Sequence, residues 1–232
     1  MTKSFDPQTV SIVVPVLNEA VALPETIRRA QANAFVLEII VVDGGSSDGT
    51  QAIAGQLGCR VLSSPPGRGG QMRLGASQAQ GDMVMFLHAD TWLPPEATRA
   101  AMQCLRDTRV VAGGFWKVFD QPRWFMRGAR FRCWLRLVWW RRLLGDQAIF
   151  VRREALEAIG GMPDLALMEE FELCRRLRRV GLLALADSTV VTSARRFTQR
   201  GAWRTYLRMG WVTLLYRCGM KPEKLRRIYE KE

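Results

Sequence analysis

The first 112 residues alternate between short apolar runs and segments with helical spacing of apolar positions. The continuous runs at 10–16 and 37–42 are rich in β-branched residues, which is typical of strands buried on both faces of a parallel sheet. Strands that alternate with helices indicate βαβ units and an α/β fold with a mostly parallel sheet. The other elements predicted here are strands at 60–62 and 83–87 and helices at 19–32, 50–57, 71–80 and 94–105.

The pattern changes after residue 112, where the alternation of strands and helices becomes less regular. Neither an internal repeat nor a low-complexity linker separates the two parts, so we expect a single domain over 1–232 with halves at 1–112 and 113–232. The second half ends in basic, aromatic helices. Its predicted elements are strands at 113–119 and 147–151 and helices at 153–159, 168–180, 203–217 and 222–229.

Three predicted strands of the first half end in polar or acidic residues. Ligands of open α/β sheets bind just beyond the carboxyl ends of the strands, so these side chains should face one crevice. Together they outline a site for a nucleotide and a metal ion. They are Asn18 and Glu19 after the first strand, Asp43 and Asp48 after the second, and His88 and Asp90 after the fourth.

The segment from Asp43 to Ser46 reads Asp-Gly-Gly-Ser. A carboxylate at this place can accept hydrogen bonds from a nucleobase imide or a ribose hydroxyl, and the glycines let the backbone approach the ligand. The alternative is a plain turn that starts a helix. The Asn18-Glu19 pair one βα unit earlier favours ligand binding.

His88 and Asp90 would point the same way if the segment is extended, because side chains alternate along a strand. A hard divalent cation with few protein ligands, bound partly by substrate phosphates, is typical of magnesium or manganese sites. Asp90 is the predicted metal ligand, with His88 beside it. Alternatively His88, the only histidine of the chain, is a structural hydrogen-bonding residue.

Three acids of the second half are candidate catalytic residues. Glu169 and Glu170 open a predicted helix, and either could act as a general base if it lies near the nucleophile. Alternatively they only stabilise the helix N-terminus electrostatically. Asp146, between a basic segment and a strand, is the third candidate.

Two groups of arginines could bind phosphate. Arg68 and Arg73 flank a glycine-rich helix start whose backbone N–H groups suit an anion. Arg195 and Arg196 could neutralise charge on a departing diphosphate. For both groups the alternative is a solvated basic surface.

The net charge of +12 is concentrated in the second half. Residues 1–122 carry 10 Lys and Arg against 11 Asp and Glu, whereas 123–232 carry 24 against 11. Within it, 123–144 interleaves Arg with Trp, which suits contact with an anionic membrane surface. Alternatively this segment packs on the domain with its Arg stems covering apolar surface. We expect no nucleic-acid binding, because no nucleic-acid fold signature accompanies the basic residues.

The chain shows no apolar run of the roughly 18 residues needed to span a bilayer, and its N-terminus lacks signal-peptide features. Its five cysteines form no Cys-x-x-Cys pair, so we expect reduced thiols and no zinc site. These features predict a cytoplasmic protein, and 123–144 would allow peripheral contact with the inner face of the plasma membrane.

Taken together, the motifs resemble those of the family 2 glycosyltransferases, which have the GT-A fold. The resemblance runs from Ser11 to about Tyr229. The segments Phe86 to Thr91, Gly145 to Phe150 and Ser193 to Arg196 are similar to a small bacterial subgroup described as radical-SAM- or selenodomain-associated transferases. The resemblance makes 1–112 the nucleotide-binding half and 113–232 the acceptor half.

The resemblance implies inverting transfer of a sugar from a nucleoside-diphosphate sugar, with Mg²⁺ or Mn²⁺ as cofactor. Asp90 corresponds to the last acid of the family's metal-binding Asp-x-Asp motif, and His88 replaces its first acid. Glu170 corresponds to the family's base, which is commonly an aspartate. The acceptor is unidentified, and the basic half suggests a lipid-linked or phosphorylated one. The residues that would face the donor are Pro15, Asn18, Glu19, Asp43 and Asp48.

Two other functions are compatible with parts of the pattern. A nucleotidyltransferase shares the α/β arrangement, but it should carry a glycine-rich basic loop after the first strand, where this chain has Asn18-Glu19. A non-enzymatic binder of anionic membrane or nucleic acid would use the basic half, and its binding should depend strongly on salt.

Overall fold

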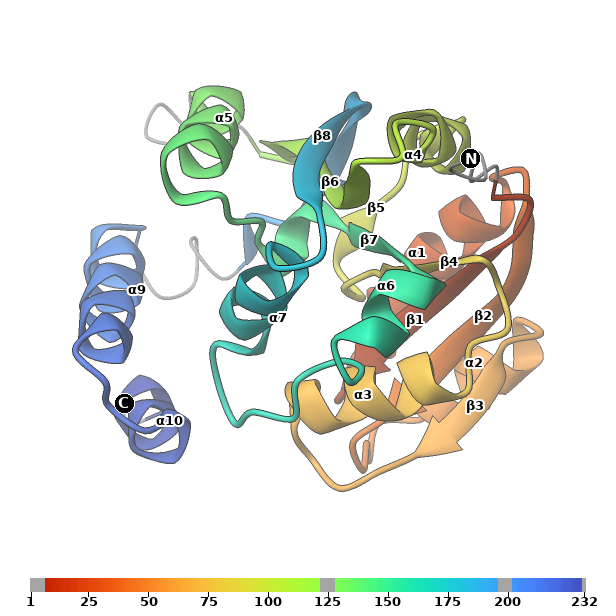
Figure 1. The fold of residues 1–232 in the computed structure, drawn as a ribbon. Coiled ribbons are helices and arrows are strands. Elements are labelled where there is room, and N and C mark those ends of the chain that lie inside the picture. Colours follow the sequence, from red (N-terminus) through yellow and green to blue (C-terminus); the bar gives the residue numbers. More distant parts are fainter. Residues whose placement is uncertain (1–6, 122–127, 196–201, 231–232) are drawn as a thin grey trace.

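The computed structural model describes residues 7–121, 128–195 and 202–230, and its centre is an eight-stranded sheet with helices on both faces (Figure 1). The strand order is β3-β2-β1-β4-β7-β6-β8-β5. The strands are β1 (Val10–Val16), β2 (Val36–Asp43), β3 (Arg60–Ser63), β4 (Met83–Phe86), β5 (Thr91–Trp92), β6 (Val110–Phe119), β7 (Ile149–Arg152) and β8 (Leu182–Thr192).

The predicted α/β fold with a mostly parallel sheet is confirmed. Strands β3, β2, β1 and β4 run parallel to one another, and β6 runs parallel to β8. The exceptions are β7, which is antiparallel to both β4 and β6, and the short β5, which is antiparallel to β8. Val16 pairs with Asp43, and Asp43 pairs with Ser63, so the first three strands end at one level.

The sheet is buried on both faces because its central strands are apolar at successive positions. Along β1, Ile12 and Val14 face a core covered by α1, α2 and α4, whereas Val13 faces a second core covered by α3, α6 and α7. The helical elements are α1 (Leu23–Gln31), α2 (Thr50–Gln56), α3 (Arg68–Ser77), α4 (Ala97–Leu105), α5 (Ala129–Trp140), the 3₁₀ turn η2 (Gly145–Gln147), α6 (Arg153–Ala158), α7 (Glu169–Leu177), α9 (Ala202–Arg217) and α10 (Pro222–Glu230).

Two strands were not predicted. β8 is eleven residues long but only half-buried over much of its length, and its Ala, Asp, Ser and Thr residues weaken the apolar signal. β5 has only two residues. The prediction for α3 was also displaced, because the helix begins at Arg68 instead of residue 71.

The C-terminal helices α9 and α10 lie next to each other on one side of the molecule, and α5 lies on the same side (Figure 1). This side is opposite the one that carries β2 and β3. Among the helices that the structure describes, none is both long and apolar enough to cross a bilayer.

Candidate active site

The carboxyl ends of β1 and β2 are tied together by a buried glutamine. Gln71 on α3 donates through Nε2 to the carbonyl oxygens of Val16 and Val42, at 2.7 and 2.8 Å. A Cβ on Gly44 would lie only 3.1 Å from the same nitrogen, so glycine is what lets the loop after β2 approach so closely. Gln71 was not predicted as a site residue, because a glutamine within a predicted helix carries no motif.

Asn18 and Asp48 join the loops that follow β1 and β2. The backbone N–H of Asn18 donates to Ser46 Oγ at 2.8 Å, and Asn18 Oδ1 accepts from the N–H of Ser47 at 2.9 Å. Asp48 accepts from the N–H of Ala20 at 3.0 Å. The predicted donor-binding residues of the two strands are therefore brought together at one edge of the sheet.

Asp43 is fully buried and organises the loop after β2. Its carboxylate accepts from the N–H groups of Gly45 and Ser46, both at 2.9 Å, and from Gln51 Nε2 at 2.6 Å. Burial raises the pKa of Asp43, but the hydrogen bonds, above all that from the Ser46 hydroxyl, outweigh it and lower the pKa. Pro15 lies in β1, one residue before the partner of Asp43 in the sheet.

The predicted phosphate-binding arginines are dispersed. Arg195, just after β8, places its Nη2 2.9 Å from the carboxylate of Glu19, so these two predicted donor-site residues meet. Arg196 lies outside the described residues. Arg73 is exposed on α3, and Arg68 instead contacts carboxylates of α7.

All three predicted catalytic acids lie in one group of charged side chains, which we call the buried polar cluster. Its ion pairs join Arg68 to Glu169 and Lys117 to Asp146. Arg68 Nη2 also lies 3.4 Å from Glu170 Oε1, and His88 Nε2 lies 3.4 Å from the same oxygen. The charge of His88 also acts on Asp146 and so links the two ion pairs. The buried polar cluster consists of Arg68, His88, Lys117, Asp146, Glu169 and Glu170, and only Arg68 and Asp146 keep more than a fifth of their side chains exposed, at 37% and 26%.

Lys117 was not predicted as a site residue. It lies in β6, its side chain is only 8% exposed, and its ammonium also lies over the ring of Phe119, 5.2 Å from the centroid. A lysine with a buried side chain needs a charged partner, which Asp146 supplies. The signal that would have identified it is a lone lysine within an otherwise apolar strand.

Gly145 allows the buried polar cluster to close. A Cβ at this position would lie 2.0 Å from Glu170 Oε1 and 2.4 Å from His88 Nε2. These distances are far below van der Waals contact, so any larger residue here would have to displace one of the two side chains.

Unsatisfied polar atoms concentrate at the buried polar cluster. Six buried side-chain N or O atoms of the described residues lack a hydrogen-bond partner. One of them is Nε of Arg136 on α5, and the positive charge of this arginine lowers the pKa of Asp146. Unpaired buried polar atoms cost free energy, and a ligand that pairs with them would remove that cost. Four belong to the cluster: His88 Nε2, Asp146 Oδ1, Glu169 Oε2 and Glu170 Oε1.

The two ends of the buried polar cluster carry opposite charge. Burial alone would raise the pKa of Glu170, but the positive charge of Arg68 and the contact with His88 lower it to about 2. Burial likewise opposes the lowered pKa of Asp146, which the charge of Lys117 produces. At one end the carboxylates of Glu169 and Glu170 face a single arginine, Arg68. At the other end Lys117 and Arg136 face a single carboxylate, that of Asp146.

His88 and Asp90 do not share an extended segment, so that part of the prediction is wrong. β4 ends at Phe86, and the N–H of Thr91 donates to the carbonyl of His88 at 3.1 Å, which closes a turn. The carbonyl of Asp90 accepts from Ser193 beside β8. Within the described ranges, no three His, Cys, Asp or Glu side chains are grouped closely enough to hold a metal ion.

The Arg- and Trp-rich segment 123–144 forms α5 from Ala129 onward, and 123–127 lie outside the described residues. Ala129 and Cys133 are buried, but much of the helix is exposed; the side chain of Trp139, for example, is 73% exposed. Packing on the domain therefore accounts for only one face of α5.

Comparison with known proteins gives consistent matches. The profile of "Glycosyl transferase family 2" matches residues 11–163. An undecaprenyl-phosphate 4-deoxy-4-formamido-L-arabinose transferase of Pseudomonas paraeruginosa is 39% identical over 106 residues, which is 40% of this chain and 31% of that protein. The corresponding transferase of Sodalis glossinidius is 34% identical over 56% of this chain and 43% of that protein. The matched stretches thus span less than half the length of these relatives.

Solved structures share the fold at low sequence identity. The mannosyltransferase PcManGT of Pyrobaculum calidifontis, in complex with GDP-Man and Mn²⁺, has a TM-score of 0.68 at 22% identity and covers 97% of this chain and 68% of its own. Glucosyl-3-phosphoglycerate synthase of Mycobacterium tuberculosis, with Mn²⁺, UDP and glucosyl-3-phosphoglycerate, has a TM-score of 0.63 at 24% identity and covers 92% of this chain and 81% of its own.

Proposed function

Because the chain belongs to glycosyl transferase family 2, we propose that it transfers a sugar from a nucleoside-diphosphate sugar to a lipid-linked or phosphorylated acceptor, with inversion at the anomeric carbon. The family and the GT-A fold predicted from the sequence are confirmed. The radical-SAM-associated subgroup stays a prediction, as does the division into a nucleotide-binding half over 1–112 and an acceptor half over 113–232.

The observation that carries this proposal is the concentration of unsatisfied polar atoms in the buried polar cluster. They lie beyond the carboxyl end of β4, where ligands of α/β sheets bind. The donor would lie along the same edge, against Pro15, Asn18, Glu19, Asp43 and Asp48. Arg68, Arg73, Arg195 and Arg196 are the candidates for its diphosphate.

Glu170 is the proposed general base, with Glu169 and Asp146 as alternatives. Its low pKa leaves it ionised at neutral pH, as a proton acceptor must be. Glu169 is 1% exposed and forms the shorter ion pair with Arg68, whereas Glu170 lies 3.4 Å from Arg68 Nη2. Asp146 keeps more of its side chain exposed than Glu170 but is ion-paired with Lys117.

The cofactor belongs to the proposal as Mg²⁺ or Mn²⁺. Carboxylate oxygens are the ligands that hard cations prefer, and two of the buried polar cluster, Asp146 Oδ1 and Glu169 Oε2, lack a hydrogen-bond partner. Asp90 would hold the ion, with His88 beside it. When bound, the cation would offset negative charge on the departing diphosphate.

A phosphorylated, lipid-linked acceptor is supported by two observations. The named activity of the Pseudomonas relative uses undecaprenyl phosphate. In this chain, Lys117 and Arg136 outnumber the one carboxylate at their end of the buried polar cluster, which favours an anionic group there. A cytoplasmic location, with α5 in peripheral contact with the membrane, completes the proposal.

The test begins with thermal unfolding in the presence of UDP-, GDP-, dTDP- and ADP-sugars, with and without Mn²⁺. A metal-dependent rise with one nucleotide would identify the donor class, because a ligand that binds only the folded state stabilises it. Transfer is then measured with polyprenyl phosphate as acceptor. Glu170→Gln should abolish turnover and keep donor affinity near that of the unmodified protein; a variant that retains most of its rate would remove Glu170 as base.

The same panel separates the alternatives. A nucleotidyltransferase would respond to a nucleoside triphosphate together with a sugar phosphate and would release diphosphate from that pair. A non-enzymatic binder would show no nucleotide-sugar response, only salt-dependent binding to anionic vesicles or oligonucleotides.

A further inference from the structure

Helix α9 carries an apolar stripe that faces solvent. Leu207, Trp211 and Leu214 are 71%, 56% and 52% exposed, and their spacing of four and three residues places them on one face of the helix. Thr205 and Val212, which are buried, lie on the opposite face. The stripe therefore points away from the body of the protein.

Helix α5 shows the same arrangement. Phe131, Trp134 and Val138 are 60%, 44% and 52% exposed, and the rings of the first two stack with centroids 5.8 Å apart. The buried residues of this helix, Ala129 and Cys133, lie on its other face. Helices α5 and α9 lie on the same side of the molecule (Figure 1).

The surroundings of both stripes are cationic. The sequences of α5 and α9 contain no Asp or Glu, and several Lys and Arg side chains are exposed in these helices or close to their ends. A large apolar patch with a basic rim is typical of helices that lie in an anionic lipid interface. The exposed cations are Arg130, Arg141, Arg204, Arg217, Lys221, Lys224 and Arg227, and they outnumber the exposed acid Glu223 on α10.

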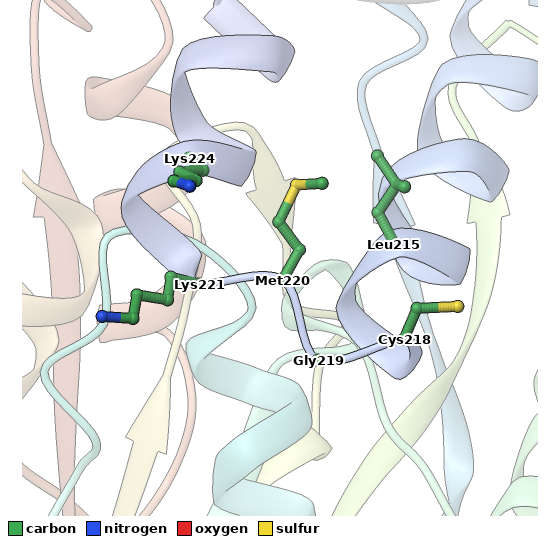
Figure 2. A pocket seen from close by; sticks show the side chains of 6 residues that line it. All are labelled: Leu215, Cys218, Gly219, Met220, Lys221 and Lys224. Carbon is green, nitrogen blue, oxygen red and sulfur yellow. The ribbon is translucent and has the colours of Figure 1, made fainter.

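The stripe of α9 continues toward a hollow of about 340 Å³ between α9 and α10. Figure 2 shows Leu215 and Cys218 on its α9 side, Lys221 and Lys224 on its α10 side, and Met220 between them. Apolar side chains with lysines at the margin of the hollow are suited to a lipid, whose acyl part is apolar and whose headgroup is anionic.

We infer that the stripes of α5 and α9, Phe131, Trp134 and Val138 with Leu207, Trp211 and Leu214, form one docking surface for an anionic lipid bilayer. This inference rests on the membrane contact of the proposed function and adds α9 as its second half. A second copy of this chain would bring the same cations to the interface and be repelled. Nucleic acid would neutralise the cations but would leave the leucines without an apolar partner.

Docking would bring the lipid surface close to the buried polar cluster. Arg136 is on the same helix as the α5 stripe, and its charge acts on Asp146. An α-helix with its side chains is about 10 Å across, so a bilayer on the outer face of α5 lies within about that distance of Arg136. A lipid phosphate could then reach the basic end of the cluster without leaving the interface.

The test is cosedimentation of the full chain with vesicles of phosphatidylcholine alone and of phosphatidylcholine mixed with phosphatidylglycerol. The test variant replaces Leu207, Trp211 and Leu214 together by alanine, which preserves the helix because alanine has the highest helix propensity. Its affinity for the anionic vesicles should fall at least about tenfold, since three apolar side chains lose their place in the interface.

The matched control replaces three exposed apolar residues outside α5 and α9, Val21, Leu37 and Val180, by alanine, and it should bind like the unmodified protein. Equal binding of the α9 variant and the unmodified protein would overturn the inference, as would absence of binding to both vesicle types. A dimer in light scattering that the α9 variant dissociates would instead assign the stripe to a second copy.

Failure of this inference can be told apart from failure of the proposed function. The α9 variant should keep the nucleotide-sugar response in thermal unfolding, because the donor edge lies on the sheet and not on α9. If no nucleotide sugar raises the melting temperature but the vesicle results are as expected, the docking surface stands and the donor assignment fails. If a nucleotide sugar raises the melting temperature but the vesicle results are not as expected, the donor assignment stands and the docking surface fails.

Discussion

Gly145→Ala is the sharpest probe of the buried polar cluster. The new Cβ would lie 2.0 Å from Glu170 Oε1, and real Cβ atoms essentially never come closer than 3.0 Å to a neighbour, so the carboxylate or the turn must move by at least 1.0 Å, the difference between the two. Misplacing a reacting group by about 1 Å costs on the order of 100-fold in rate. We therefore expect turnover to fall about 100-fold, with a loss of about 1–3 kcal/mol in unfolding free energy from the overpacking.

The assay is release of nucleoside diphosphate from the donor identified by thermal unfolding, with polyprenyl phosphate as acceptor. Gly55→Ala, within α2, is the matched control, because its Cβ would meet no atom within 4 Å and lies outside the buried polar cluster. Full activity of the Gly145 variant would refute the assignment of Glu170 and His88 to the reaction. Equal losses in both variants would show that the effect is one of general stability.

Three further predictions concern individual charges. Lys117→Met should lower the free energy of unfolding, measured with denaturant, by about 2 kcal/mol, because Asp146 loses its partner. Lys117→Arg should retain most of that free energy, and an unchanged free energy of unfolding in Lys117→Met would mean that the pair contributes nothing to stability. Asp90→Asn should weaken the donor response in thermal unfolding with Mn²⁺ but not without it, and a response unchanged under both conditions would remove Asp90 from the metal site. The pKa of Glu170 falls from about 4.5 to about 2 on folding, so its contribution to stability is present above pH 4.5 and is lost toward pH 2. Glu170→Gln should therefore flatten the decline of melting temperature over that interval, and parallel curves would contradict it.

The part of the fold that could be predicted from the sequence is the part where local pattern and tertiary burial agree. β1, β2 and β4 are apolar at successive positions, because each is covered on both faces, and such runs identify buried parallel strands directly. β8 pairs in parallel with nine residues of β6, but much of β8 is only half-buried. Its hydrogen bonding is set by the neighbouring strand, which a local pattern does not contain.

The candidate site shows a similar division. Asp146, Glu169 and Glu170 were predicted by residue type and position, and the structure brings all three together. Their partners were harder to foresee, because Lys117 comes from a different strand and Gly145 contributes only the absence of a side chain. Contacts between residues distant in sequence decide which acid is free and which is paired.

The reversed direction of β7 explains how one sheet edge acquires chemistry from both halves of the chain. β7 runs antiparallel to β4, and Ile149 at its start pairs with Phe86 at the end of β4. Residues just before β7 therefore lie at the same edge as residues just after β4, which places Asp146 near His88 although 57 positions separate them. A parallel strand would have carried Asp146 to the opposite edge. The antiparallel insertion thus brings residues from both halves of the chain to the edge where β1, β2 and β4 end, and this follows from the sheet topology alone.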